Sequence, residues 1–194
     1  MWRSPSRLLL LLSFLLACTG CERQATTAAV VVQDEDAPQR EVYGVDYTIS
    51  YEGRPRMHVR APYMAEYERE DSTYTVLSGL PGGKPVVEDT GRVQVIIYDS
   101  EGALSATIWA NRVAHGEGAD RYEATGNVEV TTPEERHVES EHLAWYEASG
   151  RVRTPGFVKI TTPTERIQGY ELNADEDLSR YTLARITGQV TASE

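Results

Sequence analysis

Cys18 and Cys21 are the only two cysteines of the chain, and both lie directly after the apolar run from Leu8 to Ala17. A thiol can form a disulfide, bind a metal ion or carry a covalently attached lipid. A disulfide framework or a metal site would need its cysteines inside the folded domain, and residues 22–194 contain none. The position of the two thiols therefore favours a modification near the N-terminus.

The apolar run has the features of a secretory signal. Arg3 and Arg7 form a positive flank before it, and the small residue Ala17 ends it. The run is shorter than the roughly 20 apolar residues that a permanent membrane-spanning helix needs. We therefore expect residues 1–17 to be a signal peptide.

The segment Leu15-Leu16-Ala17-Cys18 resembles the bacterial lipobox, which makes this a signal peptide of the lipoprotein type. The resemblance implies cleavage before Cys18, attachment of a diacylglycerol to its sulfur and acylation of the freed amine. Cleavage before Cys21 is the alternative, and an uncut N-terminal signal-anchor helix is a further one. Several acyl chains on one residue would anchor the protein stably to a membrane.

The next segment differs in composition from the rest of the chain. Residues 22–41 are rich in Gln, Ala, Thr, Asp and Glu, which is typical of a flexible linker. The apolar run Ala28 to Val32 within it also fits a first strand or a docking segment. We expect residues 18–41 to be a lipidated start and a tether, and residues 42–194 to be one domain.

Charge limits the classes of partner. The 194 residues include 30 acidic and 19 basic side chains, a formal net charge of −11, which would repel phosphate groups and excludes general binding to nucleic acid. Loss of Arg3 and Arg7 with the signal leaves 17 basic residues and a net charge of −13. A surface of this charge gives no attraction to anionic lipid headgroups.

Catalytic constellations do not emerge from the sequence. The closest pair of histidines, His137 and His142, lies five residues apart in one expected strand, so the two side chains should face opposite sides. The acidic residues are dispersed, which gives a glycosidase-like carboxylate pair no support beyond their number. No serine has nucleophile-elbow glycines, and no glycine-rich loop leads into a helix. We expect a protein that is not an enzyme and that uses no metal and no cofactor.

Two patterns repeat through the domain at a common period. In the first, a glycine is followed by apolar residues at every second position. The second is an aliphatic residue, a small residue two positions on and an aliphatic residue three positions further. The first pattern begins at Gly91, Gly126, Gly156 and, more weakly, Gly188; the second comprises Val59/Ala61/Met64, Ile108/Ala110/Val113, Val138/Ser140/Leu143 and Ile167/Gly169/Leu172. Interleaved patterns of one period indicate a supersecondary unit, here a β-hairpin, copied several times.

The alternation within each copy has the period of a strand. Glu129 and Lys159 each stand between aliphatic neighbours and should point to the other face of the sheet. The sequence Thr-Thr-Pro at Thr131 and again at Thr161 ends two strands, because proline cannot donate to a continuing ladder. We expect an all-β domain of long antiparallel strands that bend around one apolar interior.

Three segments carry a resemblance to a known family: Val138 to Trp145, Gly156 to Pro163 and Ile167 to Leu172. They resemble the LptC family, the periplasmic bridge protein of lipopolysaccharide export, and the similarity runs roughly from Val42 to Val190. The resemblance implies a β-jellyroll-like (OstA-like) stack of antiparallel strands, open along one side, at the periplasmic face of the inner membrane. Many LptC members begin with a true transmembrane helix, so a lipidated start departs from the family pattern.

The resemblance also implies a function. An LptC-like protein accepts the acyl chains of lipopolysaccharide from the inner-membrane Lpt ABC transporter (LptF and LptG, with LptB) and passes them to the soluble bridge protein LptA. Acyl chains need an apolar trough and no chemistry, and small residues along it leave room for a chain. A dry core with bends at the small residues is the alternative for each single position. The expected trough residues are Ile108, Ala110, Val113, Val128, Val130, Val138, Leu143, Trp145, Val158, Ile160, Ile167 and Leu172.

The end of the chain offers a surface for a partner. Val190, Thr191 and Ala192 follow the last repeat without a proline or lysine, and such an edge can accept a strand from another chain. The resemblance implies that LptA binds there and that the opposite edge, from Tyr43 to Val59, meets the transporter. A lipid-anchored envelope domain that binds carbohydrate or protein is the alternative function, and an envelope hydrolase is a third.

Overall fold

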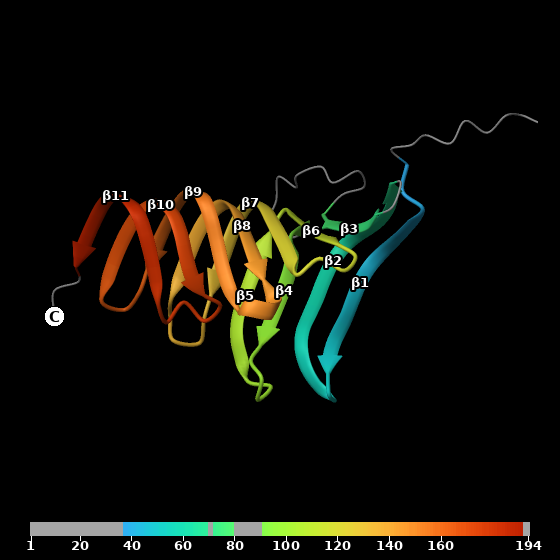
Figure 1. Cartoon of the computed structure of the whole chain (residues 1–194), viewed down its shortest axis with the longest axis horizontal. Helices are drawn as coiled ribbons and strands as arrows, with labels where there is room; N and C mark the ends of the chain where they lie inside the picture. Colours follow the sequence, from blue (N-terminus) through green and yellow to red (C-terminus); the bar gives the residue numbers. More distant parts are fainter. Residues whose placement is uncertain (1–36, 70–71, 80–90, 192–194) are drawn as a thin grey trace, which may run out of the picture. The chain divides into compact units, whose positions relative to one another are not determined.

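The computed structural model describes residues 37–69, 72–79 and 91–191, and this part of the chain is all-β (Figure 1). One short 3-10 turn, η3 (Glu147–Ser149), interrupts the strands. The expectation of an all-β domain is confirmed. The strands are β1 (Arg40–Tyr51), β2 (Arg54–Arg69), β3 (Ser72–Ser78), β4 (Val93–Tyr98), β5 (Leu104–Ala110), β6 (Arg112–Gly116), β7 (Arg121–Thr131), β8 (His137–Tyr146), β9 (Arg151–Thr161), β10 (Glu165–Asp175) and β11 (Tyr181–Thr191).

The strands form one antiparallel sheet. Its order is β11-β10-β9-β8-β7-β5-β4-β2-β3-β6, with β1 on β2 and a further pairing of β7 with β6. Figure 1 shows this order from β11 (dark red) to β1 (blue). The strands follow the alternation seen in the sequence: in β4 every second residue, Val93, Val95 and Ile97, is buried. Strands β7 and β9 end at Thr131 and Thr161, directly before the Thr-Pro pairs.

Several strands divide into two halves with different partners. Strand β2 pairs with β4 through Met57–Arg60 and with β3 from Tyr63 onwards. Strand β7 pairs with β6 through Tyr122–Thr125 and with β5 through Glu129–Thr131. Strands β4 and β3 therefore lie along different halves of β2. Strands β5 and β6 likewise lie along different halves of β7.

The division defines two sides of the sheet, named here by their central strands. The β4–β5 side consists of residues 45–61, 93–110, 128–140, 157–170 and 185–191. The β3–β6 side consists of residues 40–43, 63–69, 72–78, 112–125, 142–154 and 172–183. Residues of positive φ, which favour a bend, lie between the two sides at Gly44, Gly126, Asn127 and Glu171.

The bend explains the second repeated pattern. Val138 and Leu143 are both buried although they are five residues apart, because the register of β8 shifts between Ser140 and Ala144. One extra residue reverses which face a side chain points to, so the shift returns Leu143 to the face that Val138 occupies. The pattern of aliphatic, small and aliphatic residues is thus the mark of a bent strand.

Gly169 shows why one small residue is required at such a bend. A Cβ atom there would overlap the backbone carbonyl oxygen of Arg185 in β11. The small residue at this position serves the close approach of two strands rather than leaving space for a ligand.

Candidate functional site

The apolar faces of the two sides meet in one buried cluster. All twelve residues that the sequence predicts as a trough belong to it, and each is at most 8% exposed. The bends bring together residues of both sides, such as Val128 of the β4–β5 side and Leu172 of the β3–β6 side. The sequence pattern therefore identifies a shared interior face.

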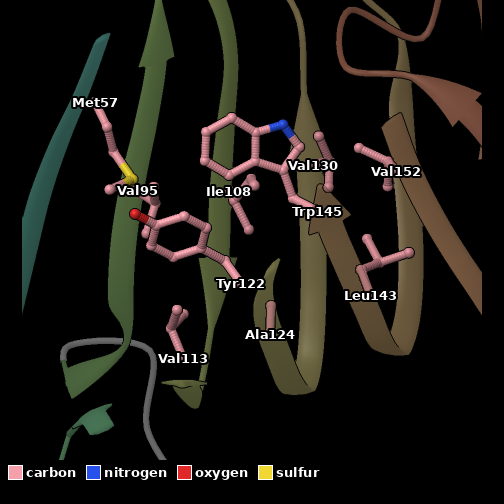
Figure 2. Close-up of a pocket in the computed structure, with 10 residues that line it drawn as sticks. All are labelled: Met57, Val95, Ile108, Val113, Tyr122, Ala124, Val130, Leu143, Trp145 and Val152. Atoms are coloured by element: carbon pink, nitrogen blue, oxygen red, sulfur yellow. The ribbon is translucent and has the colours of Figure 1, made fainter. Parts of the chain in front are cut away.

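Most of this interior is filled by its own side chains. A small cavity of about 30 Å³ lies between the two sides, which is room for about one water molecule. Figure 2 shows the indole of Trp145 and the phenol of Tyr122 in the middle of the lining residues, and their ring centres are 5.2 Å apart. The cavity is lined by Met57, Val95, Ile108, Val113, Tyr122, Ala124, Val130, Leu143, Trp145 and Val152, which include five predicted trough residues.

A larger space, the open groove, adjoins the small cavity near β1, β2 and β3. Its volume is about 320 Å³, which lies in the range of about 300–1,000 Å³ where proteins hold small ligands. The groove and the small cavity share four lining residues, so the two spaces are adjacent. The open groove is lined by Arg40, Tyr47, Ile49, Met57, Val59, Met64, Glu66, Thr75, Leu77, Val95, Val113, His115 and Tyr122.

The sequence prediction missed most residues of the open groove. Of the trough residues only Val113 lines it. The signal that could have found the others is the first copy of the second pattern, Val59/Ala61/Met64, since Val59 and Met64 both line the groove. The bend at Gly44 and the pairing of Val42 with Met64 place that copy on the interior face.

Polar side chains that line the groove contact neighbouring residues. The His115 ring stacks on Tyr122 with ring centres 4.1 Å apart, and its Nε2–H donates to the carbonyl of Ala119 at 2.8 Å. Burial, with the charge of Glu147 as a smaller cause, raises the pKa of Tyr122 to about 12. Burial likewise raises the pKa of Tyr47. Both phenols stay neutral at physiological pH, so they line the groove without adding charge.

A wider space, called the mouth here, lies between the turns at the strand tips next to the groove. Its volume is about 1,010 Å³, and Ile49 lines both the mouth and the groove. Charged side chains surround it, and Glu176 joins Arg56 across it with N–O distances of 2.9 and 3.2 Å. An apolar groove with a charged mouth can hold an amphipathic molecule with its apolar part inside.

The histidines require a correction. Val138 and Leu143 both face the core, so their neighbours His137 and His142 lie on the same outer face of β8, and the expectation that they face opposite sides is wrong. Burial and the charge of Arg121 lower the pKa of His142. Within residues 37–69, 72–79 and 91–191, no group of three His, Cys, Asp or Glu side chains is placed to hold a metal ion.

Other predicted sites lie partly or wholly outside the described residues. Val190 and Thr191 belong to β11, where their backbones pair with Arg166 and Glu165 of β10. Ala192 lies beyond the described part, as do Cys18, Cys21, the expected signal at 1–17 and most of the tether at 18–41. Strand β1 begins at Arg40, close to the expected domain boundary at residue 42.

No helix among the residues that the structure describes is long and apolar enough to span a membrane. Comparison with known proteins found no match to any protein-family model and none to a curated protein.

Proposed function

We propose that this protein is a component of the lipopolysaccharide transport bridge, as its resemblance to the LptC family implies. In this function it accepts the acyl chains of lipopolysaccharide from the inner-membrane Lpt ABC transporter (LptF and LptG, with LptB) and passes them to LptA. The chains lie between the two sides of the sheet, and the sugar headgroup stays at the mouth.

The open groove is the observation that carries the proposal. The groove continues the buried face on which all twelve predicted trough residues lie. It shares Met57, Val95, Val113 and Tyr122 with the small cavity. An acyl chain is stabilised by removal of its apolar surface from water and needs no catalytic group. The lining of Val59, Met64 and Leu77 supplies such a surface.

The proposed architecture is the β-jellyroll-like (OstA-like) stack of the family, open along one side. Support comes from the antiparallel sheet order and from the bends that separate its two sides. The charged mouth, with Arg56 and Glu176 at its border, corresponds to the open side.

The two ends of the sheet support the proposed partners. In the described part of the chain β11 pairs only with β10, and β1 pairs only with β2. An unpaired edge can bind the strand of another protein. We assign the β11 edge, with Val190, Thr191 and Ala192, to LptA and the β1 edge to the transporter.

The proposed location is the periplasmic face of the inner membrane, with an N-terminal lipid on Cys18 or, alternatively, Cys21. The support is the signal-like sequence at 1–17 and the lipobox-like Leu15-Leu16-Ala17-Cys18. An uncut signal-anchor helix would give the same location.

Site-specific photo-crosslinking in cells tests the function. A crosslinker that replaces Met64 or Leu77 should capture lipopolysaccharide, because both side chains line the open groove. Lys159 is a matched outward position: its side chain is 58% exposed and pairs with Glu139 on the outer face. Capture at Lys159 alone, or capture of a carbohydrate or a protein without acyl chains at Met64, would contradict the proposal.

A further inference from the structure

The turn between β10 and β11, residues 176–180, belongs to the β3–β6 side and contacts the β4–β5 side; it is called the strap here. Leu178 at its centre is 1% exposed and belongs to the buried core cluster. The backbone of Leu178 has φ of +57°, a conformation that a leucine seldom adopts. A surface turn that inserts an aliphatic side chain into the core in this way closes the interior at that point.

The strap is bonded to the opposite, β4–β5 side at two places. The carboxylate of Glu176 forms an ion pair with the guanidinium of Arg56 in β2 at 2.9 Å. Arg136, in the turn between β7 and β8, donates to the backbone carbonyl of Asp177 at 3.2 Å. Arg56 also donates to the carbonyl of Tyr98, which fixes it on the β4–β5 side.

The base of the strap is fixed on its own, β3–β6 side. The backbone N–H of Glu176 donates to the carbonyl of Gly150 at 3.0 Å. Asp175 pairs with Arg180 and with Arg151, and the hydrogen bond from Arg180 is the largest cause that lowers the pKa of the Asp175 carboxyl. The strap is thus hinged at one side and attached to the other by few contacts.

The attachment contacts the lining of the small cavity. The indole N–H of Trp145, which lines that cavity, donates to the carboxylate of Glu176 at 3.2 Å. The guanidinium of Arg56 lies 5.5 Å from the centre of the same indole. Arg56 and Glu176 also line the wide mouth, so this ion pair separates open space from the filled interior.

We propose that the strap is a gate: release of Glu176 from Arg56 and withdrawal of Leu178 admit acyl chains from the wide mouth to the cavity at Trp145 and onward beneath β8, β9 and β10. The inference rests on the proposed function, because it regulates passage along the same apolar interior. The attachment is small enough to break and re-form during transport, since both charged side chains keep about a fifth of their surface in water.

Hydrogen exchange of the full chain in phospholipid nanodiscs tests the gate. Addition of purified lipopolysaccharide should accelerate exchange of the Leu178 amide, which donates to Asp175 in the closed strap, by about tenfold. The same addition should slow exchange of β2 around Met64, because the groove becomes occupied. Phospholipid nanodiscs without lipopolysaccharide are the reference.

Two variants separate the gate from a passive turn. Glu176→Gln keeps the shape of the side chain and removes its charge, so it should raise strap exchange without ligand and raise the apparent affinity for lipopolysaccharide several-fold. Glu139→Gln is the matched control, because Glu139 is 48% exposed, pairs with Lys159 on the outer face and lines neither the groove nor the mouth. It should change neither quantity.

The outcomes distinguish the gate from the function on which it rests. If lipopolysaccharide slows exchange around Met64 while the strap amides and the affinity of Glu176→Gln stay unchanged, the gate is wrong and the function stands. If lipopolysaccharide alters no part of the groove, the proposed function itself is wrong.

Discussion

The interior near β1–β3 and the interior near β7–β10 are built from the same alternating pattern, yet in the described part of the chain the larger space, of about 320 Å³, lies at the first and only a cavity of about 30 Å³ reaches the second. At the β7–β10 end the lining is mainly short and β-branched, and Val138 and Val158 have no exposed surface. At the β1–β3 end, Tyr47 and Met64 are only partly buried against the core. The two ends therefore differ in how completely the facing side chains fill the gap.

A buried apolar face can therefore serve two purposes. Where opposite side chains interdigitate, the face stabilises the fold. Where they stay apart, the same face leaves a site for an apolar ligand. The strap marks the border between these uses, because the ion pair of Glu176 with Arg56 lines the mouth while Leu178 is buried in the core.

The largest effect is expected from truncation in the filled end. Trp145→Ala should lower the free energy of unfolding by about 3–5 kcal/mol, because a large aromatic side chain that is 3% exposed leaves a cavity behind. Urea denaturation of the full chain measures the change. Met64→Ala is the matched truncation in the open end and should cost less than about 1 kcal/mol, since its side chain already borders open space. Equal losses of unfolding free energy for the two variants would contradict the distinction between a filled and an open end.

A smaller loss is expected at a bend of the filled end. Gly169→Ala should destabilise the protein by about 1–3 kcal/mol, because the new methyl group meets the carbonyl oxygen of Arg185 and pushes β11 from β10. Thermal denaturation measures the loss, and hydrogen exchange should locate it in β11. Gly156→Ala is the control, because its Cβ would meet only the side-chain oxygen of Thr154 at 3.3 Å.

The fold was predictable from the sequence to the extent that it follows local periodicity. Alternation at Val128 and Val130 and the Thr-Thr-Pro sequences predicted strands and their ends, and the structure confirms both. The prediction that His137 and His142 lie on opposite faces was wrong. A shift of one residue at a bend moves every later side chain of the strand to the other face of the sheet.

The site was predictable only as a buried face. The sequence places Ile108, Val158 and their partners on one side of the strands, and all of them lie in the core cluster. The sequence cannot distinguish a filled interior from an open one. The space that remains depends on how closely residues distant in sequence, such as Tyr47 and Tyr122, approach one another in the groove. The strap was missed for the same reason: Arg56 and Glu176 are 120 residues apart.

The strap should respond to acid at its hinge. The folded state lowers the pKa of Asp175 below 3.8, mainly through the hydrogen bond from Arg180, so the carboxylate stabilises the folded strap above pH 3.8. This contribution is lost as the pH falls from 3.8 through the lowered pKa. Asp175→Asn should therefore accelerate exchange of the Leu178 amide at neutral pH, and the difference from the natural chain should shrink in stronger acid. A difference independent of pH would show that charge is not the cause.

The smallest effect is expected on the outer face of the sheet. A substitution there is the reference for substitutions at both ends of the interior. The ion pair of Lys159 with Glu139 is 3.5 Å long, and each side chain is about half exposed, at 58% and 48%. Exposed pairs of this kind contribute about 0–1 kcal/mol, because water and salt screen both charges. Lys159→Gln should therefore change the free energy of unfolding by less than about 0.5 kcal/mol and leave lipopolysaccharide capture at Met64 unchanged. A large loss of capture would mean that headgroups contact the outer face, and the groove would then not be the only surface that determines binding.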